Sequence, residues 1–265
     1  MKYILYILLI FILTGFFFFL SNKNKTEYSY YFSNTGEETF VLLHGVPGNQ
    51  ETFSLMRNEL EEKNKGVLLP HLTGSTIKED LEYVSELLET LEITNATLVV
   101  HDRGGLVGLG LLENNSKLFN RVIILDTVLE SFKSPFAQNL LGESLTGILY
   151  SDTIIGASML RTTLEQGGVP DSQVMVAEHR QNIRSFLTNF SEVESYIEKN
   201  KISLKNYSGE ITVFWGEHDP FLPKETHLQT IRDIVPQENI YILKDAKHYI
   251  QYTHAKEIVG LILEK

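Results

Sequence analysis

The sequence predicts an α/β protein with a mostly parallel sheet that is flanked by helices. Continuous apolar runs recur along the chain, among them Phe40–Leu43, Thr97–Val100 and Ile211–Trp215. Such runs are typical of parallel strands that are buried on both faces of the sheet. Amphipathic stretches with helical spacing occur at Ile77–Leu91 and His254–Leu263. A chain of 265 residues is long enough for one such core and one inserted subdomain.

The remaining elements of the sheet follow from the same pattern. Further strands are expected at Gly66–Leu69, Arg121–Leu125 and Ile240–Leu243. Tyr28–Phe32 is expected to add an antiparallel strand at the edge of the sheet. A shorter helix is expected at Glu225–Ile234, because a proline soon follows it and cannot continue a helix.

One segment interrupts the alternation of strands and helices. Residues 130–208 show helical patterning and no obvious strand, whereas a parallel crossover needs only about a dozen residues. The segment follows the C-terminal end of a strand, so it lies over the crevice where open α/β sheets bind ligands. We therefore predict a helical cap at 130–208, inserted before the penultimate strand. The core is then formed by residues 28–129 and 209–265.

The N-terminus is predicted to lie outside this core. From Tyr3 to Leu20 nearly every residue is apolar, and a helix of that length approaches the thickness of a bilayer's hydrocarbon. No small-x-small cleavage site follows, so residues 1–20 are predicted to be an uncleaved membrane anchor, with residues 21–27 as a polar tether. A cleaved signal segment, which would make the protein secreted, stays the alternative. The flanking lysines leave the side of the membrane open.

Composition limits the partners of the chain. A net charge of -11 works against nucleic acid, because phosphate binding needs a basic surface. The absence of cysteine excludes disulfides, thiolate metal sites and a cysteine nucleophile. We expect no cofactor and no metal. The expected partners are a small hydrophobic substrate, water and, through the N-terminal segment, a membrane.

The run Val99-Val100-His101-Asp102-Arg103-Gly104-Gly105 joins a predicted strand to a predicted helix. A turn this tight needs small residues at its tip, which the two glycines supply. This is the arrangement of a nucleophile elbow, with Asp102 in the place of the usual serine. Taken alone, Asp102 would be interpreted as a helix N-cap. The other strand ends decide against that interpretation.

Two later strand ends complete a triad. Asp219, in Trp215-Gly216-Glu217-His218-Asp219-Pro220, is predicted to be the acid, and His248, after the last strand, the base. The order nucleophile, acid, histidine is the order of the α/β-hydrolase fold, which we therefore predict. Asp126, at the end of another strand, is the alternative acid. In the loop His44-Gly45-Val46-Pro47, the amide of Val46 is expected to form an oxyanion hole with the amide of Arg103.

An aspartate nucleophile restricts the chemistry. Attack on an ester or amide carbonyl would give an anhydride, which is uphill. Attack on an sp³ carbon that carries a leaving group gives an alkyl ester that water can cleave. Asp102 therefore indicates cleavage of a carbon–halogen bond or of an epoxide carbon–oxygen bond. His248, held by Asp219, would activate the water that attacks the Asp102 carbonyl carbon.

The segment Thr97–Gly104 resembles the elbow of haloalkane dehalogenases, and the segments around Asp219 and His248 resemble their acid and histidine segments. The resemblance runs from Phe40 to the C-terminus, is weakest in the cap, and implies hydrolysis of a carbon–halogen bond. That family usually has tryptophan after the nucleophile and often asparagine in the loop, as halide donors. Here these positions are Arg103 and Val46.

Arg103 also matches haloacetate dehalogenases, in which this arginine helps to bind the substrate carboxylate. Their second arginine, three residues on, is Leu106 here, which disfavours haloacetate. Arg103 is still a candidate contact for a departing halide. Epoxide hydrolases are the alternative, because they share the fold and the aspartate nucleophile. They need cap tyrosines that protonate the opening ring, for which Tyr150 and Tyr196 are the candidates. A further alternative is a ligand-binding homologue without turnover.

Overall fold

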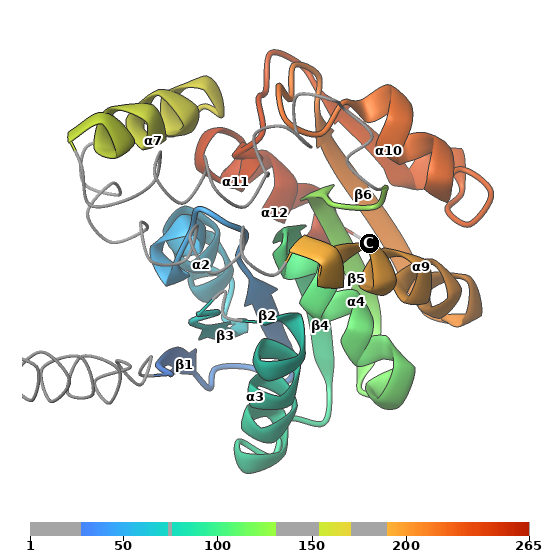
Figure 1. Ribbon diagram of the computed structural model, residues 1–265. Helices are drawn as coiled ribbons and strands as arrows, with labels where there is room; N and C mark the ends of the chain where they lie inside the picture. Colours follow the sequence, from blue (N-terminus) through green and yellow to red (C-terminus); the bar gives the residue numbers. More distant parts are fainter. Residues whose placement is uncertain (1–27, 74–75, 131–153, 171–189, 265) are drawn as a thin grey trace, which may run out of the picture.

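The structure, a computed structural model, describes residues 28–73, 76–130, 154–170 and 190–264. The strands form a seven-stranded sheet with the order β1-β3-β2-β4-β5-β6-β7, most of which can be followed by its labels in Figure 1. The strands are β1 (Tyr30–Ser33), β2 (Thr39–Leu43), β3 (Gly66–Pro70), β4 (Ala96–Asp102), β5 (Phe119–Thr127), β6 (Glu210–Gly216) and β7 (Ile240–Leu243). β1 pairs antiparallel with β3, and all other pairs are parallel. The predicted α/β-hydrolase sheet, including its antiparallel edge strand, is confirmed.

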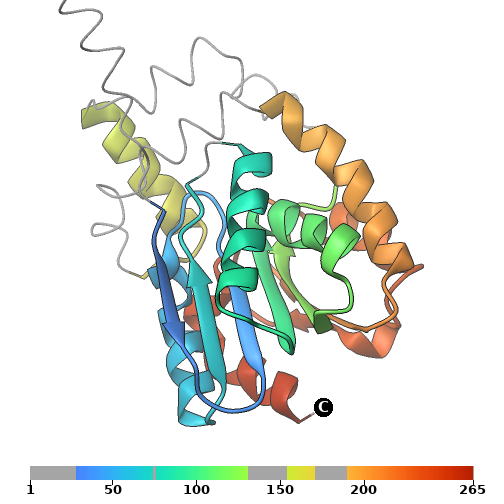
Figure 2. The same ribbon diagram turned by 90° about the horizontal axis from the view of Figure 1, so that it is seen from below.

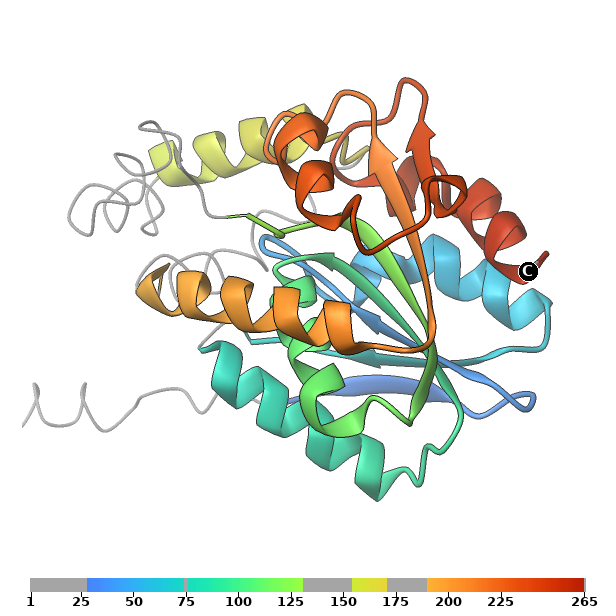
Figure 3. The ribbon, with the colours of Figure 1, turned by 90° about the vertical axis from the view of Figure 1, so that its right-hand side faces the viewer.

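Helices cover both faces of the sheet, as Figures 2 and 3 show. One face carries α3 (Ile77–Thr90), α4 (Gly104–Asn115), α9 (Phe190–Asn206) and α10 (Lys224–Ile231). The other face carries α2 (Ser54–Glu62), α11 (Ile250–Thr253) and α12 (Ala255–Leu263). Short 3₁₀ helices, η1 (Gln50–Phe53) and η2 (Gln237–Asn239), precede α2 and β7.

Alternation along each strand explains why the predicted strands are apolar throughout. In β2, Val41 and Leu43 belong to the core beneath α3 and α4, whereas Phe40 and Leu42 belong to the core beneath α2 and α12. Successive side chains of a strand point to opposite faces, so a strand covered on both faces has no polar side. Trp215 follows the same rule. It is fully buried in the α3–α4 face, and its indole N–H donates to the carbonyl of Leu222 at 3.0 Å.

Two helices are described between β5 and β6, where the sequence predicts the cap. α7 (Ile154–Gln166) lies beyond the C-terminal ends of the strands. α9 instead packs on α4, with Val193, Ile197 and Leu204 buried in the core of that face. α9 lies within the predicted cap and is also one of the helices that cover the sheet. Residues 131–153 and 171–189 lie outside the described residues, so the cap limits of 130 and 208 stay a prediction.

The expected localisation of the protein needs a correction. Among the helices of the described ranges, none is long and apolar enough to cross a membrane. The anchor predicted at residues 1–20 and the tether at 21–27 lie outside those ranges. The expectation of a membrane-anchored protein, and of the membrane as a partner, is therefore not carried further.

Candidate active site

Asp102 is the last residue of β4, and α4 begins two residues later. Its φ of 49° lies in the left-handed region, which aspartate tolerates better than most residues. Gly104 and Gly105 are required by close approach: a Cβ on Gly104 would meet the carbonyl of Leu43, and one on Gly105 would meet the side chain of Thr127. The elbow is thus a sharp turn that presses the start of α4 against two neighbouring strands.

Two backbone amides hold the Asp102 carboxylate. The N–H of Val46 donates to Oδ2 at 2.8 Å, and the N–H of Arg103 also donates to the carboxylate. Gly45 makes this approach possible, because a Cβ there would lie 2.5 Å from Oδ2. The sequence predicts these two amides as an oxyanion hole, and the structure brings both to Asp102.

His248 faces Asp102 from the loop after β7. Its Nε2 lies 3.8 Å from Oδ1 of Asp102, and its Nδ1 lies 2.8 Å from Oδ2 of Asp219. The other oxygen of Asp219 accepts the N–H groups of Phe221 at 2.7 Å and Leu222 at 3.0 Å. Asp219 is therefore fixed in orientation and occupies the position of an acid that orients the histidine.

The electrostatics of the three residues suit that arrangement. Burial raises the pKa of Asp102 above its ordinary value, although His248 and the amides of Val46 and Arg103 oppose this effect. Burial alone would lower the pKa of His248, but the charges of Asp219 and Asp102 raise it overall above 6.5. Burial would likewise raise the pKa of Asp219, yet His248 and the two donated amides lower it. Asp219 thus stays ionised beside the histidine.

Asp126, the alternative acid, is the last residue but one of β5 and lies close to Asp219. Its Oδ1 accepts the N–H of Gly216 at 2.9 Å. Burial and the nearby charge of Asp219 raise the pKa of Asp126 well above its ordinary value. His248 receives its carboxylate contacts from Asp219 and Asp102. The geometry therefore favours Asp219 as the acid.

Aromatic side chains that the sequence reasoning did not single out enclose His248. The rings of His101, Tyr249 and Phe221 have centroids 4.7, 5.0 and 5.2 Å from the His248 ring. The Nε2–H of His101 donates to the backbone carbonyl of His248 at 3.1 Å. His101 is fully buried, and burial holds its pKa well below the ordinary value of a histidine. His101 precedes Asp102 and Tyr249 follows His248, so adjacency to the triad was the available signal.

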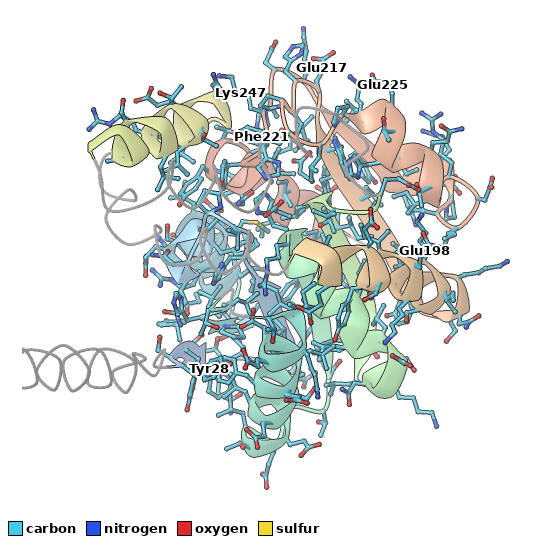
Figure 4. All side chains as sticks on the ribbon, viewed as in Figure 1. Tyr28, Glu198, Glu217, Phe221, Glu225 and Lys247 are labelled. Atoms are coloured by element: carbon cyan, nitrogen blue, oxygen red, sulfur yellow. The ribbon has the colours of Figure 1, made fainter. Side chains whose placement is uncertain are left out.

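The end of α7 contacts both loops that carry triad residues. The carbonyl of Gly167 accepts the N–H of Tyr249 at 3.0 Å. A Cβ on Gly167 would come within 3 Å of the rings of both Tyr249 and Phe221. Leu160 and Leu164 of α7 bury an apolar cluster with Tyr249. Figure 4 shows Phe221 and Lys247 near the end of α7. This cluster, against which Val46 also packs, makes an apolar wall beside the triad.

The guanidinium of Arg103, a predicted leaving-group contact, pairs with Asp80 of α3. Nη1 lies 2.7 Å from Oδ2 of Asp80, with 2% and 0% of the two side chains exposed. The other oxygen of Asp80 accepts the N–H of Thr73 at 3.0 Å and its hydroxyl at 3.2 Å. The side chain of Arg103 therefore joins the elbow to α3. Sequence reasoning missed Asp80, which has the appearance of an ordinary acidic residue in a first helical turn.

The two candidate tyrosines differ in position. Tyr150 lies outside the described residues. Tyr196 of α9 packs against the core, and the ammonium of Lys199 lies 5.4 Å from its ring centroid. Burial and then the carboxylates of Glu192, Glu82 and Glu113 raise its pKa. Those carboxylates come from α9, α3 and α4, so the environment of Tyr196 is the outer helical layer.

One group in the described part of the chain has the composition of a metal site. Glu217, His218 and Asp245 bring ligand atoms within 4.8 Å of one another. Two of the three are exposed, and Oε2 of Glu217 already accepts the N–H of Asp245 at 3.2 Å. Exposed groups of this kind are common in proteins without a metal. Asp102, Asp219 and His248 are therefore stronger candidates for a catalytic site than this exposed group.

Solved structures share the fold at low sequence identity. An α/β hydrolase fold protein from Burkholderia ambifaria is 17% identical, with a TM-score of 0.76 over 90% of this chain and 94% of that one. A haloalkane dehalogenase, DpaA from Paraglaciecola agarilytica NO2, is 18% identical, with a TM-score of 0.72 over 90% and 87%. A thermophilic esterase from Thermogutta terrifontis is 16% identical, with a TM-score of 0.72 over 89% and 92%.

A curated relative matches part of the sequence. The cis-3-alkyl-4-alkyloxetan-2-one decarboxylase of Shewanella oneidensis is 29% identical over 124 residues, 41% of this chain. The match spans only 38% of the length of that relative. The family model of the alpha/beta hydrolase fold matches residues 38–255, from β2 to the start of α12. With the sheet, the elbow and the strand-end residues described above, this match shows that the chain belongs to the α/β-hydrolase fold family.

Proposed function

We propose that this protein is a hydrolase that forms a covalent alkyl ester on Asp102 and releases it with water activated by His248. The observation that carries the proposal is the position of one buried carboxylate. Asp102 stands between two backbone amides and a histidine that is itself bound to a second carboxylate. A serine hydrolase would place a hydroxyl at this turn, and a carboxylate there restricts the attack to sp³ carbon.

The first step is displacement by Asp102. Its Oδ2 accepts the amide of Val46, so Oδ1, on the side of His248, is the oxygen that attacks. An electron pair of Oδ1 forms the new carbon–oxygen bond while the leaving group departs with the electrons of its own bond. Burial supports this step, because a carboxylate with few water contacts is a stronger nucleophile than a solvated one.

The second step is hydrolysis of the ester. Nε2 of His248 takes a proton from water, and the resulting hydroxide attacks Cγ of Asp102. The negative charge then develops on Oδ2, where the amide of Val46 already donates, and the amide of Arg103 also donates to this carboxylate. Collapse of this intermediate expels the alkoxide of the product, which receives the proton held by His248. Asp219 holds Nδ1–H throughout and compensates the charge of the imidazolium.

The leading substrate class is a small apolar molecule with a halogen on an sp³ carbon. The elbow and triad segments resemble those of haloalkane dehalogenases, and the buried wall beside the triad is apolar. A halide is expelled without a proton, whereas an epoxide needs an acid. Because Arg103 pairs with Asp80, other groups would have to stabilise the departing halide. We assign these groups to the predicted cap.

A strained four-membered lactone is the second candidate, favoured by the similarity to the oxetan-2-one decarboxylase. Its ring carries an sp³ carbon whose leaving group is a carboxylate, so opening by Asp102 needs neither a proton nor a halide site. The ring carbon–oxygen bond breaks and an alkyl ester with a free carboxylate forms. Loss of CO₂ then makes a carbon–carbon double bond and returns the electron pair of the ester bond to Asp102, without water.

One experiment tests the proposal and separates the two substrates. The purified full-length chain is given short 1-bromoalkanes or a cis-3,4-dialkyl oxetan-2-one in ¹⁸O-water for a single turnover. Hydrolysis through Asp102 puts the label in its carboxylate, as detected by mass spectrometry of the peptide, and Asp102→Asn abolishes turnover. Alkene and CO₂ from the lactone, with no label in Asp102, would favour the second candidate. Label that appears only in the product would reject the covalent route.

A further inference from the structure

Asp126 is a buried carboxyl group for which the proposed chemistry has no direct use. It ends β5 next to the end of β6, and none of its surface is exposed. Its Oδ1 accepts the N–H of Gly216, in the segment that leads to Asp219. Its Oδ2 is also buried and receives no donor among the described residues. A charged oxygen in that position would lose its hydration without compensation, which is costly.

Asp219 has a different environment. Its carboxylate receives the Nδ1–H of His248 and the amides of Phe221 and Leu222. Two neighbouring buried carboxylates do not both ionise, because their charges repel in a medium that screens weakly. The better-solvated member keeps the charge, and the other takes the proton. By this count of donors, the charge belongs on Asp219 and the proton on Asp126.

We propose that Asp126 is a neutral carboxylic acid in the resting enzyme and that its Oδ2–H donates a hydrogen bond to the carboxylate of Asp219. This inference rests on the proposed roles of Asp219 and His248. Asp126 is then a positioning residue, which acts on the reaction only through Asp219. Its hydrogen bond would add one more fixed contact to the carboxylate, beside the amides of Phe221 and Leu222.

The direction of each pKa agrees with this geometry. Burial, and then the charge of Asp219, raise the pKa of Asp126 well above its ordinary value, and a hydrogen bond to Asp219 adds to the effect. The pKa of Asp219 moves the other way, because His248 and two amides outweigh burial. The other titratable groups around the pair are Asp102 of β4, His248 and His227 of α10.

The protonation state can be measured without any substrate. In protein labelled with carboxyl-¹³C aspartate, one signal should keep the chemical shift of a protonated acid through neutral pH. It should vanish in Asp126→Asn and persist in Asp102→Asn. In Asp219→Asn the signal should titrate at a lower pH than in wild type, because the charge of Asp219 no longer adds to the effect of burial on the pKa of Asp126. A spectrum in which Asp126 is ionised at neutral pH would overturn the inference, whatever substrate the enzyme has.

Kinetics separates positioning from a purely structural role. Asp126→Asn keeps an N–H donor for Asp219 and an acceptor for Gly216, so it should slow ester hydrolysis less than about tenfold. Asp126→Leu removes the donor and should slow that step by roughly 10- to 100-fold, with a lowered pKa of His248 in the pH profile. Asp233→Asn, an exposed aspartate after α10, serves as the matched control.

Two outcomes would contradict positioning. The first is an Asp126→Leu protein that folds, unfolds at a lower denaturant concentration, and yet hydrolyses the ester at the wild-type rate. The second is equal damage from Asn and Leu, with no change in the pH profile, because rescue by the donor of Asn is the mark of the proposed hydrogen bond. Failure of all turnover in wild type would reject the proposed function but would leave the ¹³C result standing.

Discussion

The two sides of Asp102 differ in the side chains that they offer to the proposed reaction. Toward β6 and β7, His248 and Asp219 form a continuous chain of contacts with the carboxylate. Toward α3, the guanidinium of Arg103 pairs with Asp80 instead. The first side holds what ester hydrolysis needs, and the second holds a structural ion pair where a leaving-group contact was predicted. Strand ends therefore carry the shared chemistry of the fold, whereas substrate choice depends on elements outside the sheet.

The largest expected effect comes from removing the base. His248→Phe should leave alkylation intact and block hydrolysis, because Asp102 needs no base to attack an sp³ carbon. Mass spectrometry should then find an alkyl adduct on the peptide that contains Asp102. His218→Phe, at an exposed histidine, is the control and should turn over normally. An unmodified His248→Phe protein, under conditions where wild type turns over, would contradict the two-step division.

Next in size is the loss of the acid. Asp219→Asn should reduce turnover by about 10⁴-fold, because the imidazole loses both its tautomer and its charge partner. Asp126→Asn should reduce turnover only slightly. The two variants differ in one carboxyl group at adjacent strand ends, so each controls for the other in steady-state kinetics. The opposite ranking would transfer the role of the acid to Asp126.

Replacement of Arg103 tests the other side of Asp102. Arg103→Leu leaves a buried charge on Asp80 without a partner, which should reduce the free energy of unfolding by about 3–5 kcal/mol. Bromide release should fall as the elbow loses its contact with α3. The double variant Arg103→Leu/Asp80→Leu removes both charges and should recover part of the lost stability in a denaturant titration, since the contacts of Thr73 with Asp80 are lost as well.

The double variant also separates structure from leaving-group binding. If Arg103 acts only through Asp80, bromide release recovers together with stability. Persistent loss of bromide release in a stable double variant would show that the guanidinium contacts the halide, as the sequence alone suggested.

A smaller effect is expected in the pH dependence. Hydrolysis needs neutral His248, so its rate should rise with pH through the pKa of this histidine, which Asp219 and Asp102 hold above 6.5 against the effect of burial. Alkylation makes Asp102 neutral and removes one of the two raising charges. The rate at which the alkyl-enzyme decays should therefore rise at a lower pH than the pH at which His248 titrates in the free enzyme. A rise at a higher pH would contradict the assignment of His248 as the base.

The smallest effect is expected at Tyr196. Its ring packs in the helical layer beside the carboxylates of α3, α4 and α9. Tyr196→Phe should change the rate less than about twofold, since it removes one part-exposed hydroxyl. The measurement is bromide release from a bromoalkane, with diol formation from styrene oxide in parallel. Diol formation that depends on Tyr196, without bromide release, would favour epoxide hydrolysis.

The predictable part of this molecule is the part that local pattern determines. β2, β4 and β6 are mostly apolar because both faces of the sheet are covered, and the glycines after Asp102 follow from the tight turn. The chain order of Asp102, Asp219 and His248 then identifies the fold. The pairing of Arg103 with Asp80 joins segments that are distant in the sequence, and an acidic residue in a first helical turn has a sufficient local explanation.

Two other expectations rest on patterns that do not report what a segment contacts. α9 lies within the predicted cap of 130–208 and also packs on α4, because an amphipathic helix has the same spacing whether it covers a sheet or a ligand crevice. The apolar N-terminal run suggested an anchor, yet no helix in the described ranges is suited to span a membrane. Composition reports how apolar a segment is and does not report what covers it.

The contact between α7 and the histidine loop constrains how this enzyme can be redesigned. Exchanging caps between relatives is an obvious route to new specificity, because the strand ends would stay the same. Here the carbonyl of Gly167 binds the amide next to His248, and Gly167 has no room for a side chain against Tyr249 and Phe221. A transplanted cap that lacks this glycine would displace the loop that carries His248, the proposed base. A cap graft therefore has to carry Gly167, Phe221 and Tyr249 as one unit.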